Sequence, residues 1–255
     1  MEKGWKHFRY SESERVATVT FGPSDGPNDP AVEVFNEVRA LAESLRDRAG
    51  EIRVLVFQGE GPGFASGGDV ELILERLAEA SPTDAYDLAQ ATGACVRSLR
   101  RLPQPAVAAV NGVAAGPGAV LALACDLRLL AERASFHFLF TRIGAAGGDT
   151  GICWLLPRVV GLGRASELLM LGPVIDSETA LEVGLANRVV PDGELDQAAA
   201  DLARRLCSSD PAILARTKEM LNLSLEDDEW AGFSARPAEF ADYEAGFLGR
   251  RRPGG

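Results

Sequence analysis

The sequence predicts a mainly parallel α/β fold that ends in a helical region, and two observations lead to this prediction. Short apolar runs alternate with amphipathic stretches and short loops through most of the chain, which is typical of strands joined by helices. From about residue 195 onward, the apolar positions recur only at helical spacing. We therefore expect a core over residues 1–194 and a C-terminal helical region over residues 195–255.

The first half of the chain supplies alternating elements. Residues 16–21 alternate between apolar and polar side chains and predict a strand, and a loop rich in proline and glycine follows over 22–30. Apolar residues recur at helical spacing from Val34, and the helix is expected to end at Gly50. Residues 53–58 then predict a buried strand.

The second half continues the alternation before it changes to helices. A helical stripe ends at Pro103, a strand begins at Ala106, a helix begins at Ala119, and residues 127–130 predict another strand. Ser177 has a side chain suited to an N-cap. The remaining expected elements are a strand over 188–190 and helices over 164–171, 177–183, 195–206 and 211–223.

Bulk composition limits the classes of function. The 255 residues are 46% hydrophobic and 25% charged, as expected for a globular domain with a sizeable core. The net charge of −11 argues against nucleic acid and against an anionic membrane surface as partners. The N-terminus has no apolar leader segment, so we expect a cytoplasmic protein.

Cysteine and histidine content bears on metal sites. Four cysteines without paired spacing predict small buried residues in a reducing compartment: Cys95, Cys125, Cys153 and Cys207. His7 and His137 are the two imidazoles of the sequence, so a histidine-rich metal site is excluded and no metal is expected. We interpret His137, between Phe136 and Phe138, as a packed or hydrogen-bonded histidine rather than a catalytic base.

Two glycine-rich turns give the strongest indication of chemistry. The first covers residues 59–69 and follows the strand predicted at 53–58, and the second covers residues 111–118. A glycine turn at a helix N-terminus brings backbone N–H groups close to a negative ligand atom. The two turns together suggest an oxyanion hole of main-chain donors, although Pro117 in the second turn has no N–H to donate.

These two turns, in this order and about fifty residues apart, resemble the crotonase (enoyl-CoA hydratase/isomerase) superfamily. Residues 105–112 are similar to that family's run into its second oxyanion turn. Further stretches that are similar to landmarks of the family lie at residues 124–128, 161–165, 184–191 and 247–253. The resemblance covers nearly the whole chain and rests on the ordered set of motifs.

The resemblance implies a spiral of strand–strand–helix repeats with a C-terminal helical part that builds trimers, often stacked into hexamers. It also implies acyl-CoA thioester substrates, with coenzyme A as part of the substrate and no other cofactor. The thioester carbonyl is then expected between two backbone N–H groups that stabilise an enolate-like anion. The implied partners are the acyl-CoA and further copies of this chain.

By the family pattern, the N–H of Gly68 is the first oxyanion donor. The second donor position falls at Pro117, so that Gly118 or a water is left to supply the missing hydrogen bond. Alternatively, Pro117 starts a helix at its first position, where proline is favoured, and both interpretations can hold together. The residues expected to contact the substrate around Gly68 are Ala65, Ser66, Gly67 and Asp69.

The two glutamates of the hydratase pattern fall at Val120 and Phe140, which are both apolar in this chain. Water addition by two carboxylates is therefore unsupported, and Phe140 is expected to line the substrate site. Asp149 lies in the loop that faces the acyl group in this family. It is either a general acid/base or an N-cap for the helix through Cys153.

The basic C-terminal end has two interpretations. Arg250, Arg251 and Arg252, together with Lys218, are candidate ligands of the coenzyme A phosphates. The alternative for the three arginines is a solvated basic tail.

The sequence therefore predicts an enoyl-CoA hydratase or an enoyl-CoA isomerase. Isomerisation suits the chain better, because one acid/base group is enough to move a proton between two carbons. One open alternative is a catalytically silent acyl-CoA-binding or assembly subunit, for which Pro117, Val120 and Phe140 argue. Another is a different crotonase reaction, such as hydrolysis or decarboxylation.

Overall fold

The computed structural model describes residues 4–22, 32–65, 82–143 and 150–224 of the chain. Within these ranges the larger sheet has six strands, in the order β1-β2-β3-β5-β7-β10. Neighbouring strands are parallel except β1 and β2, which form an antiparallel pair. The strands cover Phe8–Ser13 (β1), Val16–Phe21 (β2), Val54–Gly59 (β3), Ala106–Val110 (β5), Leu127–Ala131 (β7) and Arg188–Val190 (β10).

Three strands of the larger sheet each lead into a strand of a smaller sheet. β3 is followed by β4, β5 by β6, and β7 by β8, and these short strands are parallel to one another. β9 joins them as an antiparallel edge strand. The described strands of this sheet are Gly63–Ala65 (β4), Val113–Ala115 (β6), Ser135–His137 (β8) and Val174–Asp176 (β9). This arrangement is the strand–strand–helix repeat that the resemblance implied.

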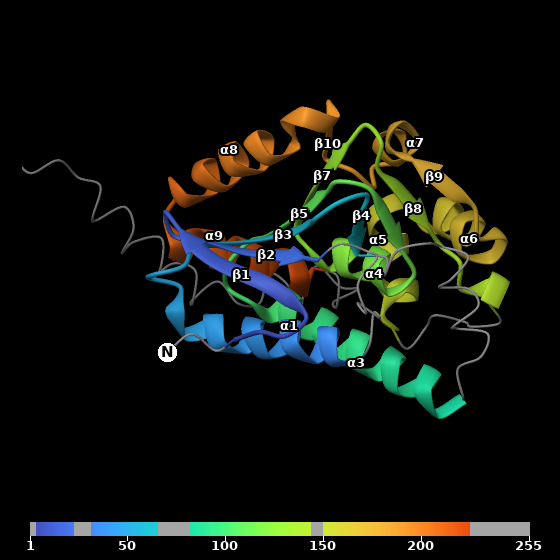
Figure 1. Cartoon of the computed structure of the whole chain (residues 1–255), viewed down its shortest axis with the longest axis horizontal. Helices are drawn as coiled ribbons and strands as arrows, with labels where there is room; N and C mark the ends of the chain where they lie inside the picture. Colours follow the sequence, from blue (N-terminus) through green and yellow to red (C-terminus); the bar gives the residue numbers. More distant parts are fainter. Residues whose placement is uncertain (1–3, 23–31, 66–81, 144–149, 225–255) are drawn as a thin grey trace, which may run out of the picture.

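Helices cover both faces of the larger sheet, as Figure 1 shows. α8 (Leu195–Cys207) lies on one face, where Ala199 and Ala203 are buried in an apolar cluster with the strands. α1 (Val32–Leu45) and α3 (Pro82–Arg101) lie on the opposite face, over the larger apolar core. The sheet is therefore the middle layer of three.

The described residues form five further α-helices. They are α4 (Pro117–Ala124), α5 (Ile152–Val160), α6 (Leu162–Leu171), α7 (Ser177–Glu182) and α9 (Pro211–Leu223). α4 is buried along its whole length and contacts α3, α5 and the strands β4 and β6 of the smaller sheet. Among the described residues, no helix combines the length and the apolar composition that crossing a bilayer requires.

Most of the predicted elements are confirmed, with some differences at their ends. α1 stops at Leu45, before Gly50, because the chain tightens into a short 3-10 helix (Arg46–Arg48), a frequent helix ending. β4, β6, β8 and β9 were not predicted, because three of them lie within or beside the glycine-rich turns and loops that follow the longer strands, and all four are too short to show periodicity. β1 was also missed, and its hydrogen-bond partner β2 follows it directly.

The N-cap of α7 differs from the prediction. Asp176 takes that position, and its carboxylate accepts a hydrogen bond from the N–H of Thr179 at 2.8 Å. Ser177 instead donates its hydroxyl to the carbonyl of Glu132 at 2.7 Å. The prediction of Ser177 as the N-cap was wrong because the preceding carboxylate satisfies the helix terminus.

The four cysteines differ in burial. Cys95 and Cys125 are buried, as predicted. Cys153 is exposed because it points away from the buried side of α5, and Cys207 at the end of α8 is half-buried. The prediction of buried cysteines was therefore wrong for these last two.

Candidate active site

Parallel strand pairing brings the two predicted glycine turns to the same place. β4 pairs with β6 so that Gly63 lies opposite Val113 and Ala65 opposite Ala114. Ala65, the last described residue of the first turn, therefore lies beside β6, which runs into the second turn at Gly116. α4 begins at this turn and contacts β4. The described ends of both turns thus lie side by side.

Glycine residues allow the two turns to approach each other closely. A Cβ atom added to Gly118 would lie 1.5 Å from the carbonyl oxygen of Ala65. A Cβ atom added to Gly112 would lie 1.8 Å from the carbonyl oxygen of Pro62. Any side chain at either position would push the two backbones apart, so these glycines set the distance between the turns.

The N-terminus of α4 is arranged around Pro117, its first residue, and this confirms the interpretation of Pro117 as a helix start. Gly116 is the N-cap, with a φ of 47° that favours glycine, and its N–H donates to the carbonyl of His137 at 3.1 Å. The N–H of Val120 donates to the carbonyl of Gly116 at 3.2 Å. The earlier N–H groups have no acceptor inside the helix. Because Pro117 lacks an N–H, that of Gly118 is the first in this row.

Apolar side chains fill the two positions where the resemblance places the hydratase glutamates. Val120 on α4 is 0% exposed, and Phe140 after β8 is 5% exposed. Both belong to the same apolar core. An unpaired carboxylate among such neighbours would carry a large desolvation cost. The packing at both positions therefore suits the apolar residues that are present.

His137 ends β8 beside the N-terminus of α4 and is half-buried. Its Nε2 lies 3.0 Å from the hydroxyl oxygen of Ser135, and its buried Nδ1 has no hydrogen-bond partner in the part of the chain that the structure describes. Burial lowers the pKa of His137, and the positive charge of Arg142 lowers it further. The imidazole is therefore neutral near neutral pH. The predicted hydrogen-bonded histidine is confirmed.

The structure describes the start of α5 from Thr150 onward. The N-cap of α5 is Gly151, in the left-handed region at a φ of 90°. The N–H of Ile152 donates to the hydroxyl of Thr150 at 3.4 Å. Gly151 thus occupies the N-cap position of α5. Asp149 lies outside the described residues, so both interpretations of its side chain, as an acid or base and as a partner of this helix start, stay predictions.

Of the predicted site residues, the structure brings together Ala65, Pro117 and Gly118, and it buries Phe140 in the core that also contains α4. The other predicted residues lie outside the described ranges. They are Ser66, Gly67, Gly68, Asp69, Arg250, Arg251 and Arg252. What was expected of them stays a prediction.

Lys218 on α9 belongs to an internal ion pair. Its ammonium nitrogen lies 2.7 Å from a carboxylate oxygen of Asp126 and donates to the carbonyl of Gln104 at 3.0 Å. A guanidinium nitrogen of Arg100 lies 3.2 Å from the other oxygen of the same carboxylate. The Lys218 side chain is 6% exposed, and burial lowers its pKa. The prediction that Lys218 contacts coenzyme A phosphates was wrong, because this charge is buried and paired within the chain.

Asn111 is a site residue whose role was not predicted from the sequence. It directly follows β5, is 9% exposed, and its side chain bonds to the backbone of the first glycine turn. A buried amide needs hydrogen-bond partners, and an asparagine after five consecutive apolar residues was the available signal. The partners lie about fifty residues earlier in the chain, which spacing alone does not reveal.

Comparisons with known proteins agree on one family. The family model described as enoyl-CoA hydratase/isomerase matches residues 12–246. The 1,2-epoxyphenylacetyl-CoA isomerase of Escherichia coli (strain K12) is 36% identical over 84% of this chain and 85% of its own length. A crystal structure from Streptomyces coelicolor A3(2) is 40% identical, with a TM-score of 0.84, over 99% of this chain and 95% of the other. A monofunctional enoyl-CoA isomerase from M. smegmatis is 31% identical, with a TM-score of 0.73, over 89% of this chain and 98% of the other.

Proposed function

The chain belongs to the enoyl-CoA hydratase/isomerase family and has the crotonase fold that the resemblance implied, and from this premise we propose that it isomerises the double bond of an enoyl-CoA. A carboxylate removes a proton from the α-carbon of a β,γ-unsaturated acyl-CoA, and the electron pair moves onto the thioester oxygen as a dienolate. The same group then delivers a proton to the γ-carbon. The product is the α,β-unsaturated isomer, so no other reactant is consumed.

The observation that carries this proposal is the burial of Val120 and Phe140. Hydration in the pattern that the chain resembles uses two carboxylates, and both of those positions hold side chains of the apolar core. Isomerisation needs one proton-transferring group, because the proton leaves and returns on one substrate. Two of the relatives compared above are named as isomerases, which supports the same choice.

The proposed oxyanion hole uses main-chain N–H groups from both glycine turns. Gly68 supplies the first donor, and Gly118 supplies the second in place of Pro117. The support for Gly118 is its position: its N–H is the first at the N-terminus of α4, and its Cα touches the carbonyl of Ala65 on the first turn. Donors fixed in advance at a developing negative charge are often the largest single contribution to catalysis.

Asp149 is the proposed carboxylate. It lies in the loop that faces the acyl group in the family that the chain resembles. The proposal gives this one group both proton transfers.

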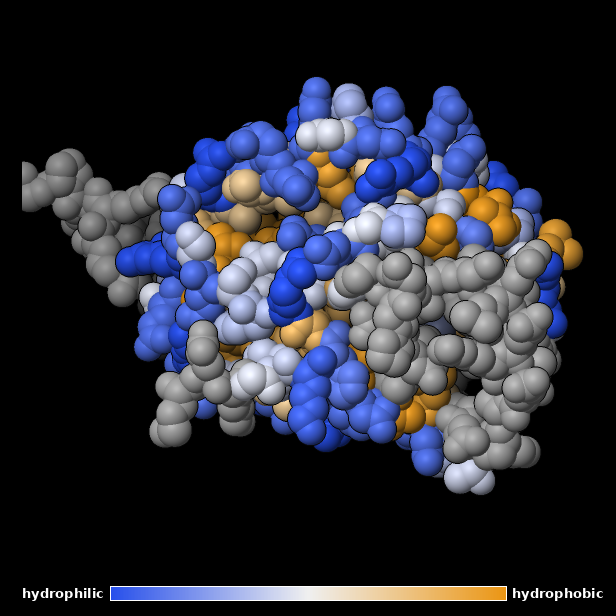
Figure 2. All heavy atoms as spheres, viewed as in Figure 1, coloured by the Kyte–Doolittle hydropathy of each residue, from blue (hydrophilic) through white to orange (hydrophobic). Residues whose placement is uncertain are grey.

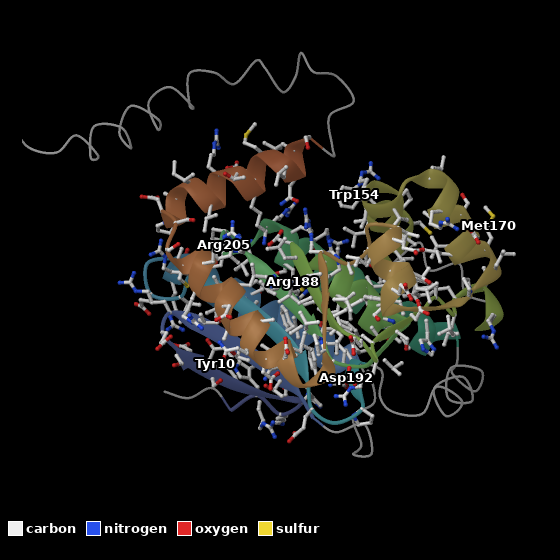
Figure 3. The ribbon with its side chains drawn as sticks, turned by 90° about the horizontal axis from the view of Figure 1, so that it is seen from above. Tyr10, Trp154, Met170, Arg188, Asp192 and Arg205 are labelled. Carbon is white, nitrogen blue, oxygen red and sulfur yellow. The ribbon has the colours of Figure 1, made fainter. Side chains whose placement is uncertain are left out.

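We also propose that the protein forms a homotrimer or a hexamer and that Arg250 and Arg251 bind the coenzyme A phosphates. Support for an oligomer comes from the α6–β9 corner, which we define as Met170, Leu171 and Val174. These side chains are 71%, 72% and 52% exposed. Figure 2 shows apolar side chains at this end of the molecule, and Figure 3 places Met170 at its outer edge. Adjacent exposed apolar side chains beside an edge strand are typical of an interface.

A silent acyl-CoA-binding subunit is the second candidate, and Pro117 is the observation in its favour. A proline at the second donor position removes one hydrogen bond from the expected oxyanion hole. Such a subunit would bind acyl-CoA without turnover.

The experiment that separates these functions starts from the full chain and β,γ-unsaturated acyl-CoA thioesters of several lengths. Isomerisation produces a conjugated thioester, which is followed by its ultraviolet absorbance. In D2O, the deuterium found at the γ-carbon measures how far the transferred proton exchanges with solvent. The same chain is offered α,β-unsaturated thioesters to measure hydration. Hydration without isomerisation would contradict the proposal. Thermal stabilisation by acyl-CoA without any turnover would favour the silent subunit.

A further inference from the structure

The side chain of Asn111 bridges three points of the first glycine turn. Its Oδ1 accepts a hydrogen bond from the N–H of Gly59 at 3.0 Å. Its Nδ2 donates to the carbonyl of Gly61 at 3.0 Å and to the carbonyl of Gly63 at 3.2 Å. These are one acceptor and two donors, so the amide satisfies the turn with every type of hydrogen bond that its side chain offers.

The backbone of Asn111 is also held by hydrogen bonds, through Arg133. Its carbonyl accepts a hydrogen bond from Nε of Arg133 at 2.7 Å. The N–H of Arg133 donates to a carboxylate oxygen of Asp192 at 2.9 Å. The next residue, Gly112, lies directly against the carbonyl of Pro62 in the first turn. Asn111 thus belongs to the second turn through its backbone and is bonded to the first turn through its side chain.

We propose that Asn111 is a positioning residue of the active site. It sets the distance between the two glycine turns, and therefore the distance between the main-chain donors of the oxyanion hole. Residues 59–63, which Asn111 bonds, come shortly before Ala65 and Gly68 in the sequence. Asn111 itself comes seven residues before Gly118. This inference rests on the proposed function, because it concerns the same oxyanion hole.

The chemistry of the amide makes the proposal specific. Asn111→Asp keeps the shape and the acceptor for the N–H of Gly59. It loses both donors and places a carboxylate beside the carbonyl oxygens of Gly61 and Gly63, which repel it. The turn is then held at one point instead of three. A displacement of about 1 Å in a catalytic group can lower the rate about a hundredfold.

The chain offers a matched control at the other end of the same strand. Gln104 precedes β5 and is 2% exposed. Its Nε2 donates to the carbonyls of Leu45 and Ile52, at 2.6 and 3.2 Å. Gln104→Glu is therefore the same change from amide to acid, at a buried amide that also bridges two carbonyls. It lies at the opposite end of β5 from the glycine turns.

The experiment compares the two variants with the unmodified chain in turnover, in melting temperature and in the absorbance of a bound dienoyl-CoA. Hydrogen bonds to the thioester oxygen polarise this conjugated probe and shift its absorbance to longer wavelength. We expect Asn111→Asp to lower kcat about a hundredfold per folded molecule and to reduce the shift, with a much smaller change in KM. Gln104→Glu is expected to lower the melting temperature while preserving kcat and the shift.

Arg133→Ala provides a second variant should Asn111→Asp fold poorly. Arg133 is exposed, and its side chain reaches the active-site turn through a hydrogen bond to the carbonyl of Asn111. We expect a smaller fall in kcat and in the spectral shift. Full kcat and an unchanged shift in Asn111→Asp or Arg133→Ala, with an active unmodified chain, would overturn the positioning role. So would an equal loss in Gln104→Glu. An unmodified chain that neither turns over nor polarises the probe would instead overturn the proposed function, and the positioning role with it.

Discussion

The carbonyl oxygen of Ala65 lies against the Cα of Gly118, so close that a Cβ atom at position 118 would be 1.5 Å away from it. The contact joins the end of β4 to the first turn of α4, two segments that are more than fifty residues apart in the chain. Backbone atoms cannot move aside as the end of a flexible side chain can. The position of α4 relative to the first glycine turn therefore depends on the absence of a side chain at residue 118.

We predict that Gly118→Ala lowers both stability and activity. The added methyl group must displace either the Ala65 carbonyl or the N-terminus of α4, at a cost of about 1–3 kcal/mol in the free energy of unfolding. The displaced donors should lower turnover about a hundredfold. Chemical denaturation and the isomerase assay measure the two effects.

Gly163→Ala is the matched control, because Gly163 is also the second residue of its helix, α6, and an added Cβ there meets no atom within 4 Å. It is expected to stabilise the chain by about 0.5–1 kcal/mol, through reduced backbone entropy of the unfolded state. Equal behaviour of the two variants would contradict the importance of the Ala65 contact.

Pro117→Gly tests whether a second donor is missing at the start of α4. The substitution restores an N–H at the first helical residue. Because the proposal assigns the second donor to Gly118, we expect turnover to change little, and a rise of up to about a hundredfold would show that Gly118 does not fill that position. Pro211→Gly makes the same change at the first residue of α9, away from the glycine turns. Both variants should lose about 1 kcal/mol of stability through the unfolded state. Unchanged turnover in Pro117→Gly would show that this position does not face the thioester.

Asp149→Asn tests the proposed acid/base. The change keeps the shape of the side chain but removes the group that accepts the proton, so turnover should fall about a hundredfold or more with nearly unchanged stability. Asp176→Ala is the control for an aspartate whose role is capping, since its carboxylate bonds the N–H of Thr179. It should cost about 1 kcal/mol and leave activity per folded molecule intact. Near-normal turnover in Asp149→Asn would refute the catalytic assignment.

Leu171→Glu tests the α6–β9 corner as a subunit contact. A charge buried in an interface would be costly, so the variant should dissociate toward the mass of one chain, 27.1 kDa. Light scattering at several concentrations measures this. Arg164→Glu adds a negative charge on the same helix at an exposed residue that is already charged, and it should leave the assembly intact. An unmodified chain of 27.1 kDa in solution would contradict the oligomer itself.

The sequence predicted best those features that depend on neighbouring residues. α9 has its predicted bounds, because Asp210 caps the helix and Pro211 fits its first position. β5 was predicted because all five of its residues are apolar and buried. The two glycine turns were found because glycine and proline have strong local preferences.

Features that depend on distant partners were missed or misjudged. The sequence shows a lysine at position 218, but its burial follows from Asp126, more than ninety residues earlier. The same holds for Asn111, whose role depends on where the backbone of Gly59 and Gly63 comes to lie. A polar side chain acquires its role from the tertiary contact that satisfies it, and no local pattern records that contact.

The stability of the fold should depend on pH through His137. Burial lowers the pKa of this imidazole, and Arg142 acts in the same direction, whereas in the unfolded chain the pKa returns to about its ordinary 6.5. Just below pH 6.5 the unfolded state therefore binds more protons than the folded state, and acidification favours unfolding. The stabilisation from a neutral, buried His137 is fully present above pH 6.5 and is lost as the pH falls below it.

His137→Gln keeps a polar partner for Ser135 but does not titrate, so the variant should lose less stability than the unmodified chain between pH 7 and pH 5. The difference in unfolding free energy between the two, measured by denaturant titration at each pH, should shift in favour of the variant as the pH falls. Subtraction removes the carboxylates that both proteins share. His7→Gln, at the other histidine of the chain, should retain the pH dependence that arises from His137. Parallel curves for His137→Gln and the unmodified chain would mean that protonation of His137 occurs equally in the folded and unfolded states. Its buried Nδ1, which has no hydrogen-bond partner among the described residues, argues against that outcome.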